Sequence, residues 1–168
     1  MMKSKTYFQE EQRLSKFVWI ILASINLIFI IGVIMQIGFS KQFGNQPLSD
    51  LDLVITTILI FFLTIVLTVF NKMQTYIDTD GIYIRYFPFQ FKYKFIDWKT
   101  VDNIYIRRYN PFFEYGGYGI KKSSKGTSFT VKGRVGLQLE LNKGKKILIG
   151  TQQPEYLKSI LLKLGKLR

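Results

Sequence analysis

The side chains that could do chemistry in this sequence are carboxylates, lysines and arginines, because its 168 residues include no Cys and no His. A thiol nucleophile, a His-based catalytic triad and the usual zinc ligands are therefore excluded. Residues 71–168 contain the carboxylates Asp78, Asp80, Asp97, Asp102, Glu114, Glu140 and Glu155. Their spacing marks no pair as general acid and base. We expect a protein that is not an enzyme, with no catalytic residue, no cofactor and no metal site.

Positive charge is concentrated in the C-terminal part of the chain. Residues 71–168 hold 19 of the 24 Lys and Arg but 7 of the 11 Asp and Glu. An anionic membrane surface attracts each nearby Lys or Arg by about 1 kcal/mol. The side chains that we expect to contact anionic headgroups are Arg107, Arg108, Lys121, Lys122 and Lys125. The alternative is that these residues, and a further cluster at 143–146, only solvate the outer faces of a small domain.

A glycine-rich stretch lies next to two of these lysines. Gly116, Gly117 and Gly119 precede Lys121 and Lys122, and exposed backbone amides beside ammonium groups can cradle a phosphate or a carboxylate. The glycines lack the spacing of a nucleotide-binding motif. The favoured interpretation is a structural loop whose glycines adopt unusual backbone angles.

Two long uncharged segments dominate the first 70 residues. Residues 17–39 contain 23 consecutive residues without a charge, and residues 53–70 contain 18. At about 1.5 Å per residue in a helix, such runs approach or cover the roughly 30 Å hydrocarbon core of a bilayer. We predict transmembrane helices at 17–39 and 51–70, joined by a short extracytoplasmic loop at 40–50. Asn26 should hydrogen-bond to the second helix, at Thr57, Thr64 or Thr68.

The flanking charges predict which side of the membrane each segment occupies. Residues 1–16 carry Lys3, Lys5, Arg13 and Lys16, whereas Lys41 is the one basic residue of the loop. By the positive-inside rule the loop faces outward, so residues 1–16 form a cytoplasmic N-terminal segment. Two spans return the remaining chain to the same side. The expected location is the inner cell membrane, as a multi-pass protein with both termini in the cytoplasm.

Alternating apolar and polar residues begin directly after the second run and predict a β-rich domain over 73–168. Asp80-Gly81 is a strong hairpin signal between two such segments. We predict seven antiparallel strands, at 74–79, 82–89, 91–95, 101–109, 127–131, 135–141 and 145–149. The spacing of Leu157, Ile160, Leu161 and Leu164 then predicts an amphipathic helix that begins at Pro154. Together with the spans, the fold class is a membrane α-helical hairpin plus a mainly β, α+β domain.

Three segments of this domain resemble bacterial pleckstrin-homology-like membrane proteins: residues 115–121 (YGGYGIK), 133–139 (GRVGLQL) and 148–155 (LIGTQQPE). The resemblance implies a seven-stranded pleckstrin-homology fold, capped by a C-terminal helix, and supplies no catalytic residue. Phosphoinositide-reading members hold inositol phosphates with Lys and Arg around a long first hairpin loop. The turn taken here as the counterpart, residues 78–81, carries two carboxylates, which would repel phosphate.

The function expected from these features is presentation of the domain at the cytoplasmic membrane surface, for protein interaction or anionic-lipid contact. The expected partners are the bilayer, with its anionic lipids, and a protein partner or a second copy of the chain. The alternative is an accessory subunit of a membrane enzyme or transporter whose partner carries the chemistry. Nucleic-acid binding, which Tyr105, Arg107 and Tyr109 on one strand would suit, is less favoured for a membrane-anchored domain.

Overall fold

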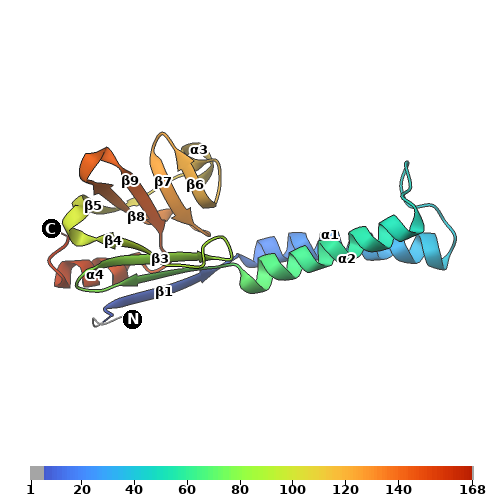
Figure 1. The fold of residues 1–168 in the computed structure, drawn as a ribbon, viewed down its shortest axis with the longest axis horizontal. Helices are drawn as coiled ribbons and strands as arrows, with labels where there is room; N and C mark the ends of the chain where they lie inside the picture. The colour runs from blue at the N-terminus through green and yellow to red at the C-terminus, as the bar shows by residue number, and fades with distance from the viewer. Residues whose placement is uncertain (1–5, 168) are drawn as a thin grey trace. The chain divides into compact units, whose positions relative to one another are not determined.

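A computed structural model describes residues 6–167, apart from the side chain of Lys143, so Lys3 and Lys5 lie outside the described residues. The chain divides into two compact units, which are described separately (Figure 1). One is helical and comprises Leu14–Asn71. The other is β-rich and contains the described residues on both sides of the helical unit, up to Arg13 and from Lys72 onward.

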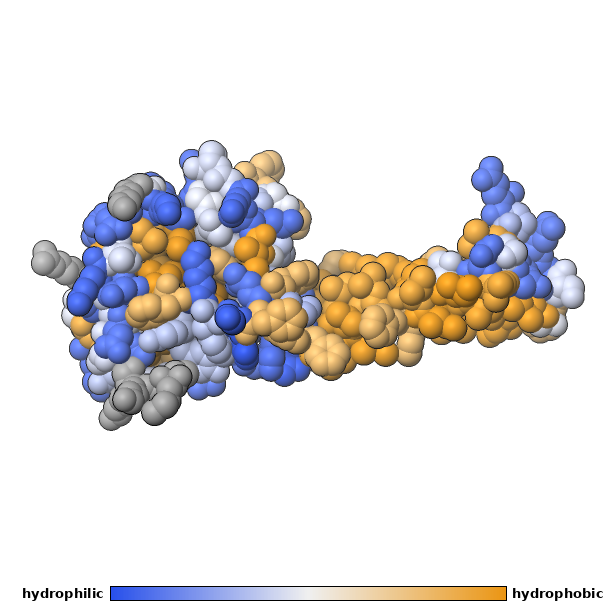
Figure 2. All heavy atoms as spheres, in the orientation of Figure 1, coloured by the Kyte–Doolittle hydropathy of each residue, from blue (hydrophilic) through white to orange (hydrophobic). Residues whose placement is uncertain are grey.

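The helical unit consists of two antiparallel helices. The first comprises α1 (Lys16–Val33) and a π-helical end, η1 (Ile34–Gly38), and the second comprises α2 (Asp50–Ile65) and η2 (Val66–Phe70). Both are long and apolar enough to cross a membrane, as the sequence predicted, and only 11% of an 18-residue apolar stretch of each is buried. Figure 2 shows hydrophobic side chains over the visible face of both helices and polar ones at the loop between them. A core helix of a soluble protein would be mostly covered instead.

Polar contacts between the helices occur at two levels. The side-chain amide of Asn26 donates to Thr64 Oγ1 at 2.8 Å, which confirms the expected interhelical hydrogen bond. Nearer the loop, Gln36 Nε2 donates to Asp50 Oδ1 at 2.7 Å. Ser49 caps α2, because its Oγ accepts from the backbone N–H of Asp52 at 3.2 Å.

The β-rich unit contains two sheets. Sheet A has the strand order β1-β2-β3-β4, and sheet B has the order β5-β8-β9-β7-β6. The strands of sheet A are β1 (Phe8–Arg13), β2 (Lys72–Ile77), β3 (Gly81–Phe87) and β4 (Lys94–Asp97). Those of sheet B are β5 (Val101–Arg108), β6 (Gly119–Ser123), β7 (Gly126–Thr130), β8 (Val135–Leu141) and β9 (Lys146–Gly150). Short helices lie between them: η3 (Trp98–Thr100), α3 (Pro111–Tyr115) and η4 (Asn142–Gly144).

The terminal helix α4 (Pro154–Lys163) confirms the predicted amphipathic helix. Its Leu157 and Leu161 are buried, as are Ile84 of sheet A and Leu139 and Leu148 of sheet B. Gly165, with a φ of 65°, follows the helix in the left-handed conformation that glycine adopts without strain. The expected mainly β domain with a C-terminal helix is therefore present.

The predicted strand count and pairing were wrong in two respects. The described residues form nine strands, not seven, because β1 and β6 were not predicted. The strands are also not all antiparallel, because β7 pairs with β9 in parallel. The inward side of β1 carries one apolar residue, Phe8, followed by Glu10 and Gln12, and β6 is an edge strand with the sequence GIKKS, so neither shows a sustained hydrophobic alternation.

Strand β1 is joined to the far end of the chain by buried hydrogen bonds. Glu10 accepts from Thr151 Oγ1 at 2.7 Å and from the backbone N–H of Gln152 at 2.6 Å. Gln12 Nε2 donates to the carbonyl of Gly150 at 2.7 Å. These contacts satisfy polar groups that would otherwise be costly to bury. The six residues of β1, which precede the helical unit in sequence, are thus an integral part of the β-rich unit.

Candidate functional site: the basic side chains of the β-rich unit

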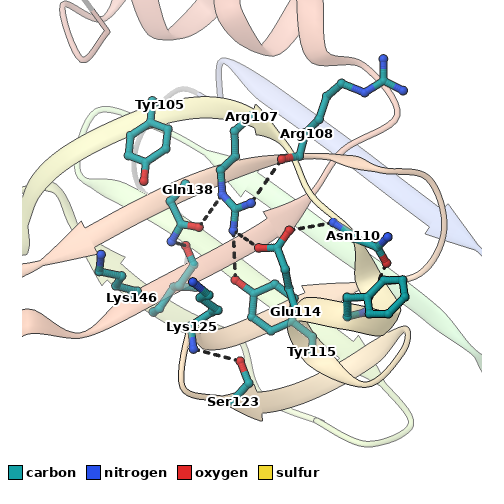
Figure 3. Close-up of polar contacts among 12 residues, drawn as sticks. Tyr105, Arg107, Arg108, Asn110, Glu114, Tyr115, Ser123, Lys125, Gln138 and Lys146 are labelled. Carbon is teal, nitrogen blue, oxygen red and sulfur yellow. Dashed lines mark hydrogen bonds and ion pairs between the residues drawn. The ribbon is translucent and has the colours of Figure 1, made fainter.

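Arg107, the first of the predicted headgroup contacts, lies at the centre of a polar cluster on sheet B (Figure 3). Its Nη2 lies 2.7 Å from Glu114 Oε2, and its Nε donates to Gln138 Oε1 at 3.0 Å. A longer contact of 3.4 Å runs from Nη2 to the hydroxyl of Tyr115. The guanidinium is therefore committed to partners within the domain.

The turn after β5 positions Glu114 for this ion pair. Asn110 caps α3, because its Oδ1 accepts from the backbone N–H groups of Phe112 and Phe113 at 3.1 and 3.2 Å. In return, Glu114 Oε1 accepts from the backbone N–H of Asn110 at 2.7 Å. Gly116, with a φ of 71°, ends the helix. The first glycine of the glycine-rich stretch therefore serves as a helix cap.

The ion pair shifts the titration of both partners. The hydrogen bond from Arg107 is the main cause that lowers the pKa of Glu114 below its ordinary value of 4.5, against the opposing effect of burial. The hydrogen bond to Glu114 likewise raises the pKa of Arg107. Both side chains are about three-quarters covered. Because these charge-assisted contacts occupy the Arg107 guanidinium, its role is to stabilise the turn and not to bind an external anion.

The other four predicted contacts are exposed and lie on different parts of sheet B. Arg108, the last residue of β5, extends away from the Arg107–Glu114 pair (Figure 3). Lys121 and Lys122 are adjacent on β6 and so point to opposite faces. Lys125 lies in the turn from β6 to β7, where its backbone N–H donates to Ser123 Oγ at 3.1 Å. The five residues thus do not form one continuous patch.

Lys122 belongs instead to a cleft of about 660 Å³ whose walls come from both sheets. We call it the lysine cleft. One wall is β4 of sheet A, and the other is formed by β6, β7, β9 and the turns next to them. Four lysines line it: Lys94, Lys122, Lys145 and Lys146. The hydroxyl-bearing residues Ser123, Ser124 and Thr127 also lie on its walls.

A close approach of two strands gives the cleft its shape. Gly126 opens β7 with a φ of 114°, and a Cβ at this position would lie 2.3 Å from the carbonyl oxygen of Lys146. Only glycine allows β7 to run this close to the start of β9. The parallel pair Thr127↔Ile147 follows immediately. This contact brings the lysine-bearing start of β9 next to the β6–β7 hairpin.

The positive charge of the lysine cleft is only partly neutralised. Lys146 forms an ion pair with Glu140 at 3.0 Å. Within residues 6–167, the structure records no ion pair for Lys94, Lys122 or Lys145. The ammonium of Lys94 lies 5.1 Å from the centre of the Phe129 ring. Partial burial, followed by repulsion from Lys122 and Lys145, lowers the pKa of Lys94.

This arrangement can bind an anion. Asp97 is the one carboxylate that lines the cleft, and its Oδ1 accepts the backbone N–H of Lys99 at 2.8 Å. An anion would relieve the mutual repulsion of three lysines and could accept hydrogen bonds from the hydroxyl groups. Across the described part of the chain, no group of three His, Cys, Asp or Glu could hold a metal ion.

Of the four lysines that line the cleft, only Lys122 was among the predicted headgroup contacts. Lys94, Lys145 and Lys146 were not. A signal existed, because Lys145 and Lys146 fall in the basic cluster at 143–146 and Lys94 lies in an alternating strand. Combining them required the pairing of β7 with β9 and the position of β4 opposite them.

The fold and the cleft together define a class: a chain with two apolar helices of membrane-spanning length and a two-sheet β domain that has a lysine-lined cleft. A family model matches residues 2–164, which is nearly the whole chain. The chain belongs to this family, which is described as a family of unknown function, DUF6141. Searches of curated proteins and of solved structures give no match.

Proposed function

We propose that this chain is an integral protein of the inner cell membrane that presents a pleckstrin-homology-like domain on the cytoplasmic surface. The domain has no enzymatic activity of its own and binds an anionic ligand in the lysine cleft. The observation that carries the proposal is the exposed apolar surface of two helices. In the sequence these helices lie between β1 and β2, two strands that pair with each other. Exposing that apolar surface to water would cost a large amount of free energy, whereas the acyl chains of a bilayer cover it.

The strand pairing supports the pleckstrin-homology-like part of the proposal. Strands β1 to β4 form one antiparallel meander, and β5, β8 and β9 form another, followed by the terminal helix α4. These are seven antiparallel strands in two sheets plus a helix, and the β6–β7 hairpin is an addition at one edge. In this interpretation the first strand precedes the helices. The helical unit then replaces the first hairpin loop, and residues 78–81 form the second.

The same pairing supports a hairpin orientation with both termini on one side. Arg13, at the end of β1, lies opposite Lys72, at the start of β2. Two paired strands of one sheet must lie on the same side of a bilayer, because a sheet with a lipid-exposed edge cannot cross it. The distribution of basic residues around the spans favours the cytoplasm as that side.

The charge of the lysine cleft selects the class of ligand. Three lysines without an ion-pair partner among residues 6–167 surround a space large enough for a phosphate-bearing group. In a domain tethered directly to the spans, the anions at highest local concentration are headgroups of the cytoplasmic leaflet. We therefore assign anionic lipid headgroups, such as phosphatidylglycerol, as the ligand.

Cysteine labelling of the full-length chain tests the membrane topology, because the natural sequence contains no Cys. Asn45→Cys lies in the loop between the helices, and Lys158→Cys lies on the exposed side of α4. A membrane-impermeant maleimide should label position 45 in spheroplasts and position 158 only after permeabilisation. Equal labelling of both positions in intact spheroplasts, or recovery of the chain in the soluble fraction without detergent, would refute the proposal.

A further inference from the structure

One end of sheet A holds both connections to the helical unit and also the loop between β3 and β4. The register places Arg13, Lys72 and Phe87 in one row across β1, β2 and β3. The chain leaves β1 after Arg13 and enters β2 at Lys72, and these are the two connections to the helices. The segment that follows Phe87 therefore starts at the same end of the sheet. We call this segment, residues 88–93, the aromatic loop.

The aromatic loop exposes large apolar side chains. Phe89 is 62% exposed and Phe91 is 73% exposed, which is unusual for phenylalanine in a water-soluble surface. The loop sequence is PFQFKY, so these rings alternate with polar residues and stand next to Lys92. The two rings, two positions apart, give the loop an apolar surface that an apolar partner can cover.

Local contacts hold the two rings in place. The ring of Phe91 packs edge-on against Phe87 with centroids 5.4 Å apart, and the ring of Phe89 lies 5.7 Å from that of Tyr86. The backbone N–H of Gln90 donates to the carbonyl of Tyr86 at 2.8 Å. The loop therefore presents its rings in a defined arrangement, which reduces the entropy lost when they enter another phase.

At the other side of the loop, Tyr93 anchors it to the sheet. Its hydroxyl donates to Gln74 Oε1 at 2.9 Å, and the guanidinium carbon of Arg85 lies 4.5 Å from the centre of its ring. Gln74 also receives hydrogen bonds from Arg85 and itself donates to Glu11 of β1 at 2.8 Å. The loop is thus joined to β3 and to β1 and β2, the two strands that lead to the helices.

Chain length limits how far this end of sheet A can lie from the helix ends. Three peptide units join Arg13 to Lys16, and two join Phe70 to Lys72. At no more than about 3.6 Å per residue, these connections span at most roughly 11 and 7 Å. If the helices cross a bilayer, that end of the sheet lies within the depth of the headgroup layer. Aromatic side chains favour this layer, and lysines favour its anionic charge.

We propose that the aromatic loop is a lipid-contacting element, which inserts Phe89 and Phe91 at the boundary between headgroups and acyl chains. The inference rests on the membrane-spanning role proposed above for the two helices. It is independent of the lysine cleft, because none of the residues 88–93 lines that cleft. Insertion of the loop gives the domain a third attachment to the bilayer besides its two covalent connections.

Fluorescence of the full-length chain in vesicles tests this proposal. Phe91→Cys is labelled with an environment-sensitive NBD fluorophore and reconstituted into vesicles of phosphatidylcholine and phosphatidylglycerol. The matched control is Thr79→Cys, an exposed position in the β2–β3 turn at the opposite end of sheet A, beyond the pair Ile77↔Ile82. Leu27→Cys, exposed on α1, reports on the membrane span. Lipids that carry a quencher in their acyl chains are then added to the mixture.

The proposal predicts a blue-shifted emission at position 91 that the lipid-borne quencher reduces, and a water-like, unquenched emission at position 79. Quenching at position 27 without quenching at position 91 would overturn the aromatic-loop proposal alone. A blue shift at position 91 without lipid quenching would also overturn it, because a protein surface would then cover the loop. Absence of quenching at position 27 would refute the membrane-spanning role and this inference with it.

Discussion

At the residue scale, the ion-pair partners of the basic side chains decide which of them can bind an external anion. Arg107 was a predicted headgroup contact, yet Glu114, Gln138 and Tyr115 occupy its guanidinium. Lys122 has no such ion pair within the described residues and faces the lysine cleft. The sequence shows both as members of basic clusters, because it does not reveal which carboxylate lies 2.7 Å away.

Neutralising the lysine cleft is expected to weaken the binding of anionic headgroups. Each lysine near an anionic lipid contributes about 1 kcal/mol, so Lys122→Gln combined with Lys145→Gln should weaken binding about tenfold or more. The measurement is a titration of the full-length protein, in a neutral detergent, with short-chain phosphatidylglycerol and separately with inorganic phosphate. Weaker binding of the lipid alone identifies the headgroup as the ligand, and weaker binding of both identifies a general phosphate site.

The matched control for the cleft is Lys158→Gln combined with Lys163→Gln, which removes the same charge from exposed positions on α4. It should leave the affinity nearly unchanged. Equal weakening by the two double variants would assign the effect to net charge and would contradict a specific role of the cleft.

The Arg107–Glu114 pair is expected to make stability depend on acid pH. Because the folded-state pKa of Glu114 lies below 4.5, the pair contributes fully above the unfolded-state pKa and loses its contribution as pH falls through the folded-state value. At pH 7, Glu114→Gln should lower the free energy of unfolding by about 1–2 kcal/mol. Chemical unfolding at several pH values should show this difference shrinking toward pH 3.

Glu155→Gln is the control for the pH series, since Glu155 is exposed in the first turn of α4. We expect it to leave the pH profile of the parent chain in place. A stability difference between the parent and Glu114→Gln that stays constant from pH 7 to pH 3 would show that the ion pair is not the origin of the effect.

At the element scale, segments with a regular hydrophobic pattern could be predicted, and segments stabilised by polar contacts could not. The two apolar helices and α4 follow directly from continuous or 3.6-residue periodicity. Strand β1 has the sequence FQEEQR, and its inward residues Glu10 and Gln12 are accommodated by partners near residue 150. Those partners are more than 130 positions away, so no local pattern indicates them. The lysine cleft shares this origin, because it depends on pairing between distant strands.

Loss of the Glu10 carboxylate should destabilise the β-rich unit. Glu10→Ala removes the acceptor for the buried Thr151 Oγ1 and for the partly buried backbone N–H of Gln152. The expected cost is about 1–3 kcal/mol in the free energy of unfolding. Thermal unfolding of the full-length protein in detergent measures it. Gln9→Ala, on the exposed side of the same strand, should change stability little, and an equal effect of both would contradict the role of Glu10.

At the scale of the whole molecule, the two units are interleaved in sequence. The helical unit, Leu14–Asn71, interrupts the β-rich unit between two strands that pair with each other. An apolar hairpin and a β domain could be recognised from the sequence as separate segments. That the domain starts before the hairpin could not, since the strand that shows it has a polar sequence.

Replacing the helical unit with a tight turn should yield a soluble, folded domain. Arg13 and Lys72 are cross-strand partners, so Asn-Gly can connect them in place of residues 14–71 as a two-residue hairpin turn. We expect this chain to remain in the supernatant without detergent and to unfold cooperatively. The comparison is a chain that begins at Lys72 and lacks β1. It should aggregate or unfold at a lower temperature, because β2 becomes an unprotected edge. Equal behaviour of the two would contradict the structural role of β1.

The position of β1 also has a consequence for biosynthesis. Residues 8–13 leave the ribosome before either apolar helix, but β2 is made only after both helices, and Thr151, which binds Glu10, is made later still. Until then β1 lacks its strand partner and its buried hydrogen bonds. Completion of the domain therefore waits for the hairpin to be translated. A ribosome that stalls within the helices leaves an orphaned strand for proteases to remove.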